Sequence, residues 1–201
     1  MKVICFSGLK GGTGKTTLAV HFCNYLHFYE KKSVCLLNFD KQRVLSLLAK
    51  KNSAPYVVTE IAFQDFNRNY LETMGQDYIV VDLPGLLSIE NVLLEKWELA
   101  DAHILPFLNS ALDFYKLLAF FQLAAKSNIQ LKQTFLLPNK YSRQAGMVMQ
   151  ENIKRQPQFM DSTILPSIKA SNQLTDIAFI QHDSTQMSYL RPSFINIINK
   201  M

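Results

Sequence analysis

The stretch Gly8-Leu-Lys-Gly-Gly-Thr-Gly-Lys-Thr-Thr17 decides the fold of this 201-residue chain. It holds four of the seven glycines in the sequence and lies between an apolar run at 2–7 and a helical pattern at 15–30. We interpret it as a phosphate loop of the GxxxxGK[ST] type, with Gly8 and Gly14 as its glycines. In such a loop the backbone N–H groups turn towards phosphate oxygens, and the following helix directs the positive end of its dipole at them.

The residue types of the loop suggest a role for each polar side chain. Lys15 is expected to bridge the β- and γ-phosphates of a nucleotide, and Thr16 is expected to hold Mg²⁺. A phosphate loop also needs a carboxylate near the metal, and Asp82 ends an apolar strand pattern at the place where such a carboxylate sits. Asp40 follows another strand pattern at the same end of the sheet, within reach of the attacking water, although a turn or helix-cap role is the alternative.

Strand and helix patterns alternate along the chain. We predict strands over 2–7, 33–39, 56–59, 78–83, 102–108, 134–137 and 162–165, and helices over 15–30, 42–51, 64–74, 88–100, 111–126, 146–155 and 191–201. Several strands are continuously apolar, which is typical of strands that are buried on both faces. The sequence therefore predicts an α/β fold, in which one domain over residues 1–201 has a mainly parallel twisted sheet with helices on both faces.

Composition excludes several protein classes. Hydrophobic residues make up 48% of the chain and charged residues 18%, which excludes disorder. The longest apolar run, Leu117 to Ala125, is shorter than the roughly 20 residues of a membrane span, and the N-terminal apolar stretch is too short for a signal peptide, so we expect a cytoplasmic protein. Cys5, Cys23 and Cys35 lack CxxC spacing, which favours reduced, buried thiols.

The net charge of +5 lies in the last third of the chain. Residues 126–201 carry 9 Lys and Arg against 4 Asp and Glu, whereas the charges of residues 1–125 cancel. A basic C-terminal third favours an anionic partner, with a merely solvated surface as the alternative.

Lys10, a second lysine inside the loop, narrows the choice among families with a phosphate loop. The segment Lys10–Thr17 resembles the deviant Walker A box of the ParA/MinD ATPases. Val34–Gln42 resembles their vlliDxDpQ segment, Asp77–Pro84 resembles their yDyiiiDxP segment, and Pro106–Phe114 is similar to a later block that lies near the nucleotide. In size the chain is most like the short plasmid-type ParA partition ATPases, which are P-loop NTPases of the SIMIBI type.

This resemblance implies an ATP- and Mg²⁺-dependent enzyme that forms a sandwich dimer when ATP is bound. It implies that Lys10 reaches the phosphates of the partner protomer, that Asp40 positions the attacking water and that Asp82 supports magnesium through water. The nucleotide contacts that it implies are made by Gly11, Gly12, Thr13, Gly14, Lys15, Thr16 and Thr17, with Thr17 at the α-phosphate. Asn139, after the strand at 134–137, is our candidate for holding the base, with a loop residue that bonds its own backbone as the alternative.

Two positions depart from the family pattern. Asn38 stands where the family usually has an acid, which reduces the negative charge near the metal. Arg43 follows Gln42 where a small residue is common. We therefore expect slow hydrolysis that a partner protein stimulates.

The function that we favour is a DNA-partition or cargo-positioning ATPase. ATP would drive dimerisation, the dimer would bind DNA without sequence preference on the nucleoid, and a ParB-like or cargo-adaptor protein would stimulate hydrolysis. The candidate phosphate contacts are Lys140, Arg143, Lys154, Arg155, Lys169 and Arg191.

The alternative function is a MinD-like ATPase that positions itself on a membrane. A stripe of apolar residues runs along the C-terminal segment at Phe194, Ile197, Ile198 and Met201. Surface anchors are usually rich in Lys and Arg, and few flank this stripe, so a helix packed on the core is favoured and a membrane partner is not expected. Iron–sulfur relatives need cysteines beyond the strand at 78–83, and tyrosine-kinase relatives carry a tyrosine-rich tail, so neither class fits this sequence.

Overall fold

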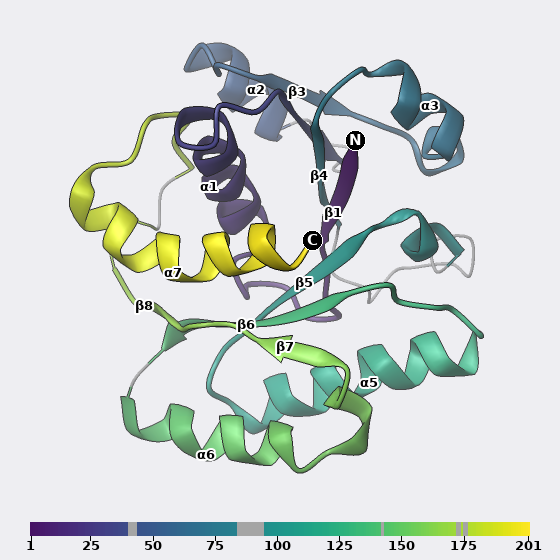
Figure 1. Ribbon diagram of the computed structural model, residues 1–201, viewed down its shortest axis with the longest axis vertical. Coiled ribbons are helices and arrows are strands. Elements are labelled where there is room, and N and C mark those ends of the chain that lie inside the picture. Colours follow the sequence, from purple (N-terminus) through teal and green to yellow (C-terminus); the bar gives the residue numbers. More distant parts are fainter. Residues whose placement is uncertain (40–43, 84–94, 142, 172–173, 175–176) are drawn as a thin grey trace.

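The computed structural model describes residues 1–39, 44–83, 95–141, 143–171, 174 and 177–201 (Figure 1). Its strands are β1 (Lys2–Phe6), β2 (Val34–Asn38), β3 (Val57–Glu60), β4 (Tyr78–Asp82), β5 (Ala102–Phe107), β6 (Thr134–Tyr141), β7 (Ser162–Ile164) and β8 (Ile168–Lys169). Its α-helices are α1 (Lys15–Phe28), α2 (Val44–Lys51), α3 (Arg68–Thr73), α5 (Ala111–Lys126), α6 (Arg143–Lys154) and α7 (Ser184–Lys200). Short 3-10 turns are η1 (Phe63–Asp65), η3 (Lys96–Leu99) and η4 (Pro157–Phe159).

The strands form one sheet in the order β3-β2-β4-β1-β5-β6-β7, with β8 paired to the far end of β6. All the strand pairings described are parallel, so the predicted parallel sheet is confirmed. β1 lies in the middle of the sheet, where Phe6 is level with Asp82 of β4 and Ile104 of β5. The carboxyl ends of parallel strands meet at one edge, so the loop that follows β1 lies at the centre of that edge, where ligands bind in such sheets.

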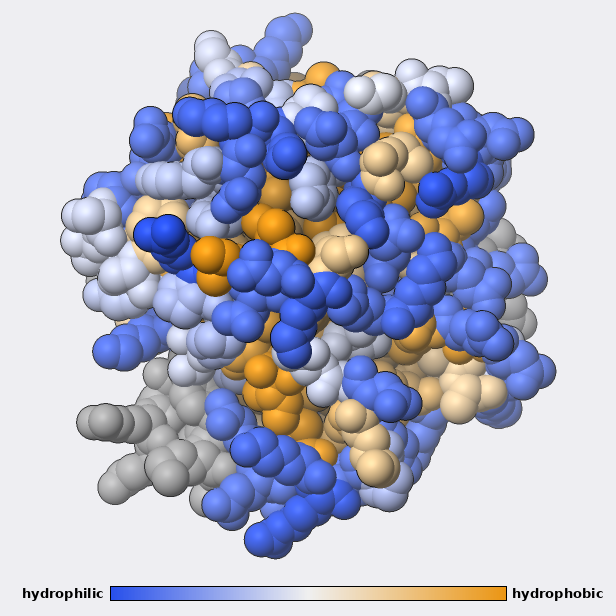
Figure 2. Space-filling view, in the orientation of Figure 1, coloured by the Kyte–Doolittle hydropathy of each residue, from blue (hydrophilic) through white to orange (hydrophobic). Residues whose placement is uncertain are grey.

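Alternation along the strands produces two hydrophobic cores, one on each face of the sheet. Ile4 and Phe6 of β1 belong to the core that α1 and α7 cover, and Val3 and Cys5 belong to the core that α3, α5 and α6 cover. Helices on both faces are therefore confirmed, and α7 lies beside α1 in Figure 1. The face drawn in Figure 2 is mostly hydrophilic, with apolar residues visible in gaps between polar side chains.

Aromatic rings of α7 pack against those of α1. The ring centroids of Phe22 in α1 and Phe194 in α7 lie 5.0 Å apart in an edge-to-face arrangement, and both side chains are fully buried. Such a pair contributes about 0.5–1.5 kcal/mol beyond the burial of its area. The three cysteines are buried free thiols, as expected. No helix in the described part of the chain combines the length and the hydropathy of a membrane span.

The last helix begins at Ser184, so the predicted start at 191 was wrong. Its N-terminus is a capping box: Asp183 accepts a hydrogen bond from the Gln186 backbone, and the Gln186 side chain accepts one from the Asp183 backbone. This box satisfies N–H groups that a helix start leaves unpaired, and Pro192 lies inside the helix rather than at its beginning. The Asp-x-x-Gln spacing was a signal for this start.

The strand at 134 continues to Tyr141, so the predicted end at 137, before Pro138, was also wrong. β7 is level with β6 as far as Leu136, and β8 begins to pair with β6 at Asn139. Pro138 lies between these two pairings, where its missing N–H interrupts neither of them.

Other boundaries differ less. The helix predicted over 64–74 is divided into η1 and α3, because Asn67 caps α3 by accepting a hydrogen bond from the Tyr70 backbone. α6 begins at Arg143, three residues before the predicted 146. Most of the helix predicted over 88–100 lies outside the described residues, and its described end includes the 3-10 turn η3.

Candidate functional site

The glycine-rich loop joins the central strand β1 to α1, which is the order that a phosphate loop requires. Gly12 and Gly14 have φ values of 77° and 92°, in the left-handed region that favours glycine. A Cβ at Gly14 would lie 2.6 Å from the Asn139 side-chain nitrogen, so a side chain there would displace the Asn139 amide. Gly14 is the N-cap of α1 and has no side-chain cap, so the first N–H groups of the helix are available to an anion.

The consensus spacing of the loop is offset from our sequence interpretation by one residue. The pattern GxxxxGK places four residues between its glycines, and five lie between Gly8 and Gly14. Leu9 therefore occupies the position of the first consensus glycine, and the assignment of Gly8 to that position was wrong. The part from Gly11 to Thr17 is unaffected.

Lys15 lies inside the loop. Its ammonium donates a hydrogen bond of 2.8 Å to the Lys10 carbonyl oxygen, and the residue is only 7% exposed. Burial lowers the pKa of Lys15, and the nearby Asp82 carboxylate opposes this shift. A largely buried cation is costly unless an anion accompanies it, so the loop as built suits phosphate.

Thr16 and Asp82 lie together beside the loop. The Thr16 hydroxyl donates a 2.6 Å hydrogen bond to Asp82 Oδ2, and Asp82 is buried at the end of β4. Asn38, at the end of β2, is level with Asp82 and is also buried. A hydroxyl and one carboxylate are oxygen ligands of the kind that Mg²⁺ prefers when phosphates complete its shell, so this pair fits the metal. The described residues hold no group of three or more metal-ligating side chains.

The ammonium of Lys10, unlike that of Lys15, lies against α5 and not inside the loop. Its ammonium is 2.8 Å from Asp113 Oδ2, and the Ser110 hydroxyl donates a short hydrogen bond to the same oxygen. Ser110 also caps α5 by accepting from the Asp113 backbone. The family resemblance places Ser110 and Asp113 in a block near the nucleotide, but Asp113 was given no role among the predicted site residues. The Ser-x-x-Asp spacing at the start of the 111–126 pattern indicates its cap, but no local pattern indicates its contact with Lys10.

Asn139 contacts the phosphate loop directly. Its side-chain nitrogen donates a 2.9 Å hydrogen bond to the Thr13 carbonyl, and its side-chain oxygen accepts one from the Lys140 backbone. It also lines a pocket of about 70 Å³ with Gly14, Thr17 and Leu18 of the loop and α1, and with residues from the β8 region. The structure thus places Thr17 and Asn139 at one pocket, and Asn139 bonds a neighbouring backbone group as well.

The remaining predicted residues lie outside the described part of the chain or have exposed side chains. Asp40, Gln42 and Arg43 lie outside the described residues. The side chains of Lys140, Lys154, Arg155, Lys169 and Arg191 are exposed, as a surface for an anionic partner requires, and that of Arg143 lies outside the described part. Arg155 is paired loosely with Glu151, at 3.9 Å.

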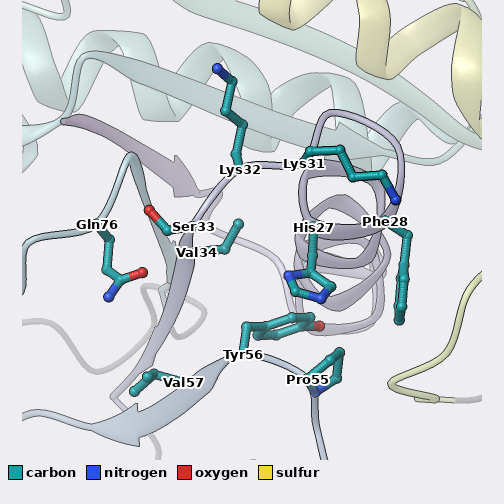
Figure 3. A pocket seen from close by; sticks show the side chains of 10 residues that line it. All are labelled: His27, Phe28, Lys31, Lys32, Ser33, Val34, Pro55, Tyr56, Val57 and Gln76. Atoms are coloured by element: carbon teal, nitrogen blue, oxygen red, sulfur yellow. The ribbon is translucent and has the colours of Figure 1, made fainter.

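A larger pocket of about 500 Å³ lies away from the loop (Figure 3). Residues at the starts of β2 and β3 line it, at the edge of the sheet opposite the phosphate loop. The rings of His27 and Tyr56 face each other in it, whereas the Lys32 side chain extends away from them. Its polar groups do not converge on one point, so the site at the phosphate loop is the stronger candidate.

Comparisons with known proteins bear on the family and the fold. Residues 4–179 match the profile of the CobQ/CobB/MinD/ParA nucleotide binding domain. A putative plasmid partition protein from Borrelia burgdorferi bound to AMPPNP has a TM-score of 0.73 at 17% identity, over 99% of this chain and 98% of that one. The MinD cell division protein of Aquifex aeolicus has a TM-score of 0.71 at 17% identity, over 100% and 98%.

A complex of a Cyanothece McdA variant with ATP has a TM-score of 0.69 at 16% identity, over 99% of this chain and 95% of that one. No curated protein sequence matches the chain significantly. At these identities the solved structures establish the fold, and the profile covers most of the chain, including the phosphate loop, Asp82 and Asn139. The protein belongs to the CobQ/CobB/MinD/ParA family of nucleotide-binding domains.

Proposed function

We propose that the protein is an ATPase of the partition or cargo-positioning class that dimerises with ATP and then binds DNA without sequence preference. The observation that carries this proposal is the different placement of the two loop lysines. The Lys15 ammonium is buried inside the loop, whereas the Lys10 ammonium lies on α5, where its side chain is 27% exposed. This difference supports a role for Lys15 at the nucleotide of its own protomer and a role for Lys10 at that of a second protomer.

Hydrolysis would use the residues gathered at the carboxyl edge of the sheet. Lys15 would neutralise the β- and γ-phosphates, Thr16 and Asp82 would hold Mg²⁺, and Asp40 would position the attacking water. The metal would supply charge stabilisation for the transferring phosphoryl group. The amide of Asn38 beside Asp82 adds no negative charge near the metal, which supports slow turnover and a role for an activating ParB-like or cargo-adaptor protein.

DNA binding is supported by the exposed basic side chains of the C-terminal third. Lys154 and Arg155 lie together at the end of α6, and both are exposed. A two-fold dimer would double the surplus positive charge, and each neutralised phosphate adds to the affinity through counterion release. We find no zinc-finger spacing or helix-turn-helix pattern in the sequence, so we expect contacts with phosphates rather than bases.

A membrane-positioned ATPase is the second candidate, because MinD is among the similar structures. The apolar stripe that motivated it is directed inwards: Phe194 and Ile197 are fully buried, and Ile198 and Met201 pack against the same core. The described geometry of α7 therefore supports a core helix rather than a surface anchor, and the partition or cargo-positioning function remains the proposal.

The experiment is a salt titration of binding to two unrelated DNA duplexes, with ATP and with ADP. We expect binding with ATP alone, with equal affinities for the two duplexes. For roughly 4–8 phosphates per dimer, log affinity against log salt should have a slope of about −4 to −7. Replacing Lys154 and Arg155 by Ala should lower the affinity for both duplexes equally. Replacing Lys50 and Lys51, an exposed pair at the end of α2, is the matched control and should change neither.

Binding that is equal with ATP and with ADP would contradict the proposal. Absence of DNA binding together with firm co-sedimentation with liposomes, lost on removal of 188–201, would favour the membrane candidate instead. In this second test α7 is shortened, so folding of the shortened chain is checked by circular dichroism.

A further inference from the structure

A chain of two buried hydrogen bonds begins at the residue that precedes the phosphate loop. The Ser7 hydroxyl lies 2.9 Å from Nδ1 of His103 on β5, and Nε2 of the same ring lies 3.0 Å from the carbonyl oxygen of Trp97 in η3. Ser7 and Trp97 are each 1% exposed, and His103 is fully buried. None of these three residues belongs to the set that the loop motif predicts.

The partners fix the state of the imidazole. A carbonyl oxygen only accepts hydrogen bonds, so Nε2 carries the hydrogen and Nδ1 is left as an acceptor for the Ser7 hydroxyl. Burial lowers the pKa of His103 to about 4, and the hydrogen bond to Trp97 opposes this shift, so the ring is neutral at neutral pH. The neutral ring can therefore satisfy Ser7 on one side and Trp97 on the other.

Ser7 is fixed to β5 in two ways. Besides its side-chain contact with His103, its backbone N–H donates a 2.9 Å hydrogen bond to the Ile104 carbonyl. The next residue, Gly8, has a φ of 138°, a backbone conformation that glycine adopts without strain, and the chain turns there as it leaves the strand. Because Ser7 is fixed to β5, the phosphate loop starts from a fixed position at Gly8.

Trp97, at the other end of this chain of hydrogen bonds, contacts the helix that holds Lys10. The Trp97 ring stacks on Phe120 of α5, with centroids 4.3 Å apart and planes at 20°. α5 carries Asp113 in its first turn, and Asp113 binds the Lys10 ammonium. His103 thus joins two supports of the same loop: Ser7 at its start, and, through Trp97 and Phe120, the helix that holds Lys10.

We propose that His103 is a positioning residue for the nucleotide site, which holds the start of the phosphate loop in register with α5 through Ser7 and Trp97. It touches no nucleotide itself. The inference rests on nucleotide binding by the loop, and its turnover readout rests on the proposed function as well. Loss of the Ser7 hydroxyl should loosen the loop and weaken nucleotide binding, beyond any effect on folding.

The test compares two buried serines. Ser7→Ala removes the hydroxyl at His103, and Ser193→Ala is the matched control, because Ser193 is fully buried and donates a 2.6 Å hydrogen bond to the Pro166 carbonyl. Ser7→Cys keeps a weak donor at the same place. Binding of a fluorescent ATP analogue, ATP turnover and urea unfolding are measured for each protein, at a temperature where all are folded.

We expect Ser7→Ala to weaken nucleotide binding about 3- to 10-fold, Ser7→Cys to fall between Ser7→Ala and the wild type, and Ser193→Ala to bind as the wild type does. Equal affinities for Ser7→Ala and Ser193→Ala would overturn the proposal, as would a wild type that binds no nucleotide. If Ser7→Ala does not fold, the comparison of Ser7→Cys with Ser193→Ala decides in the same way. A wild type that binds nucleotide without turnover would contradict the proposed function only, and affinity alone would then decide the role of His103.

Discussion

Lys10 and Asp113 form an ion pair across 103 positions of sequence, with 2.8 Å between Nζ and Oδ2. The Asp113 side chain is 1% exposed and the Lys10 side chain 27%, so the carboxylate is buried and the ammonium partly accessible. The pair holds the signature lysine on α5 of its own protomer. To reach the phosphates of a partner, as we propose, Lys10 has to leave Asp113.

Asp113→Asn should therefore make ATP-driven dimerisation easier. The amide keeps an acceptor for Ser110 but loses the charge that holds Lys10. Release of Lys10 costs roughly 1 kcal/mol in each protomer, typical of a partly exposed pair, and both protomers of the dimer are relieved of this cost, so dimerisation should be roughly 30-fold tighter. Light scattering across a range of protein concentrations with ATP would measure it.

The matched control is Glu72→Gln, which removes an exposed ion pair with Arg68 on α3, far in sequence from the loop. It should leave dimerisation unchanged. Weaker dimerisation of Asp113→Asn would show that Asp113 also supports Lys10 in the dimer, and would contradict release as the role of this contact.

Replacing each of the two loop lysines by alanine should impair a different step. Lys15→Ala removes the buried charge inside the loop, so nucleotide binding itself should fall, by several kcal/mol at most. Lys10→Ala should bind nucleotide nearly as the wild type does but should neither dimerise with ATP nor hydrolyse it. Nucleotide titration and light scattering separate the two effects. Normal dimerisation and turnover by Lys10→Ala would rule out the proposed role of this lysine.

The elements that local patterns determine could be predicted from the sequence. The glycine cluster and the apolar runs predicted the phosphate loop and the parallel sheet, and they assigned Thr16 and Asp82 to one metal site, where the structure has them in contact. The contacts of Asp113 with Lys10 and of His103 with Ser7 join residues about a hundred positions apart, and no spacing rule in the chain indicates them. They arise because β5 lies beside β1 and carries α5 to the loop.

Asn38→Asp tests whether the missing acid slows hydrolysis. Asn38 is buried at the end of β2, level with Asp82, so the substitution places a second carboxylate near the proposed metal site. If it organises the magnesium waters, turnover at saturating Mg²⁺ should rise about 10-fold, for about 1.4 kcal/mol of barrier. Phosphate release under single-turnover conditions would measure this rate. An unchanged or slower rate would show that the site is adapted to the amide.

Stability should fall as the pH decreases below neutrality, because His21, His103 and His182 are buried and burial lowers the pKa of each. Burial lowers the pKa of His103 to about 4 and, together with the nearby His182, lowers that of His21 to about 4. An unfolded histidine takes up its proton near pH 6.5, so between pH 6.5 and 4 the unfolded state binds more protons than the folded state. The stability that the neutral rings provide is therefore complete above pH 6.5 and is lost as the pH falls towards 4.

Between pH 7 and pH 5 the free energy of unfolding should decrease by roughly 2 kcal/mol for each of His21 and His103, and His182, whose pKa is also lowered, adds to this decrease. Urea unfolding at pH 7, 6 and 5 measures the decrease. In His21→Asn, which removes one of these rings, the loss between pH 7 and 5 should be smaller by roughly 2 kcal/mol, whatever the stability of this variant at pH 7. His21 lies in α1, where its Nε2 contacts the Leu174 carbonyl, so the variant leaves the hydrogen bonds of His103 in place. An unchanged dependence on pH in His21→Asn would show that the buried ring of His21 does not carry this share of the acid sensitivity.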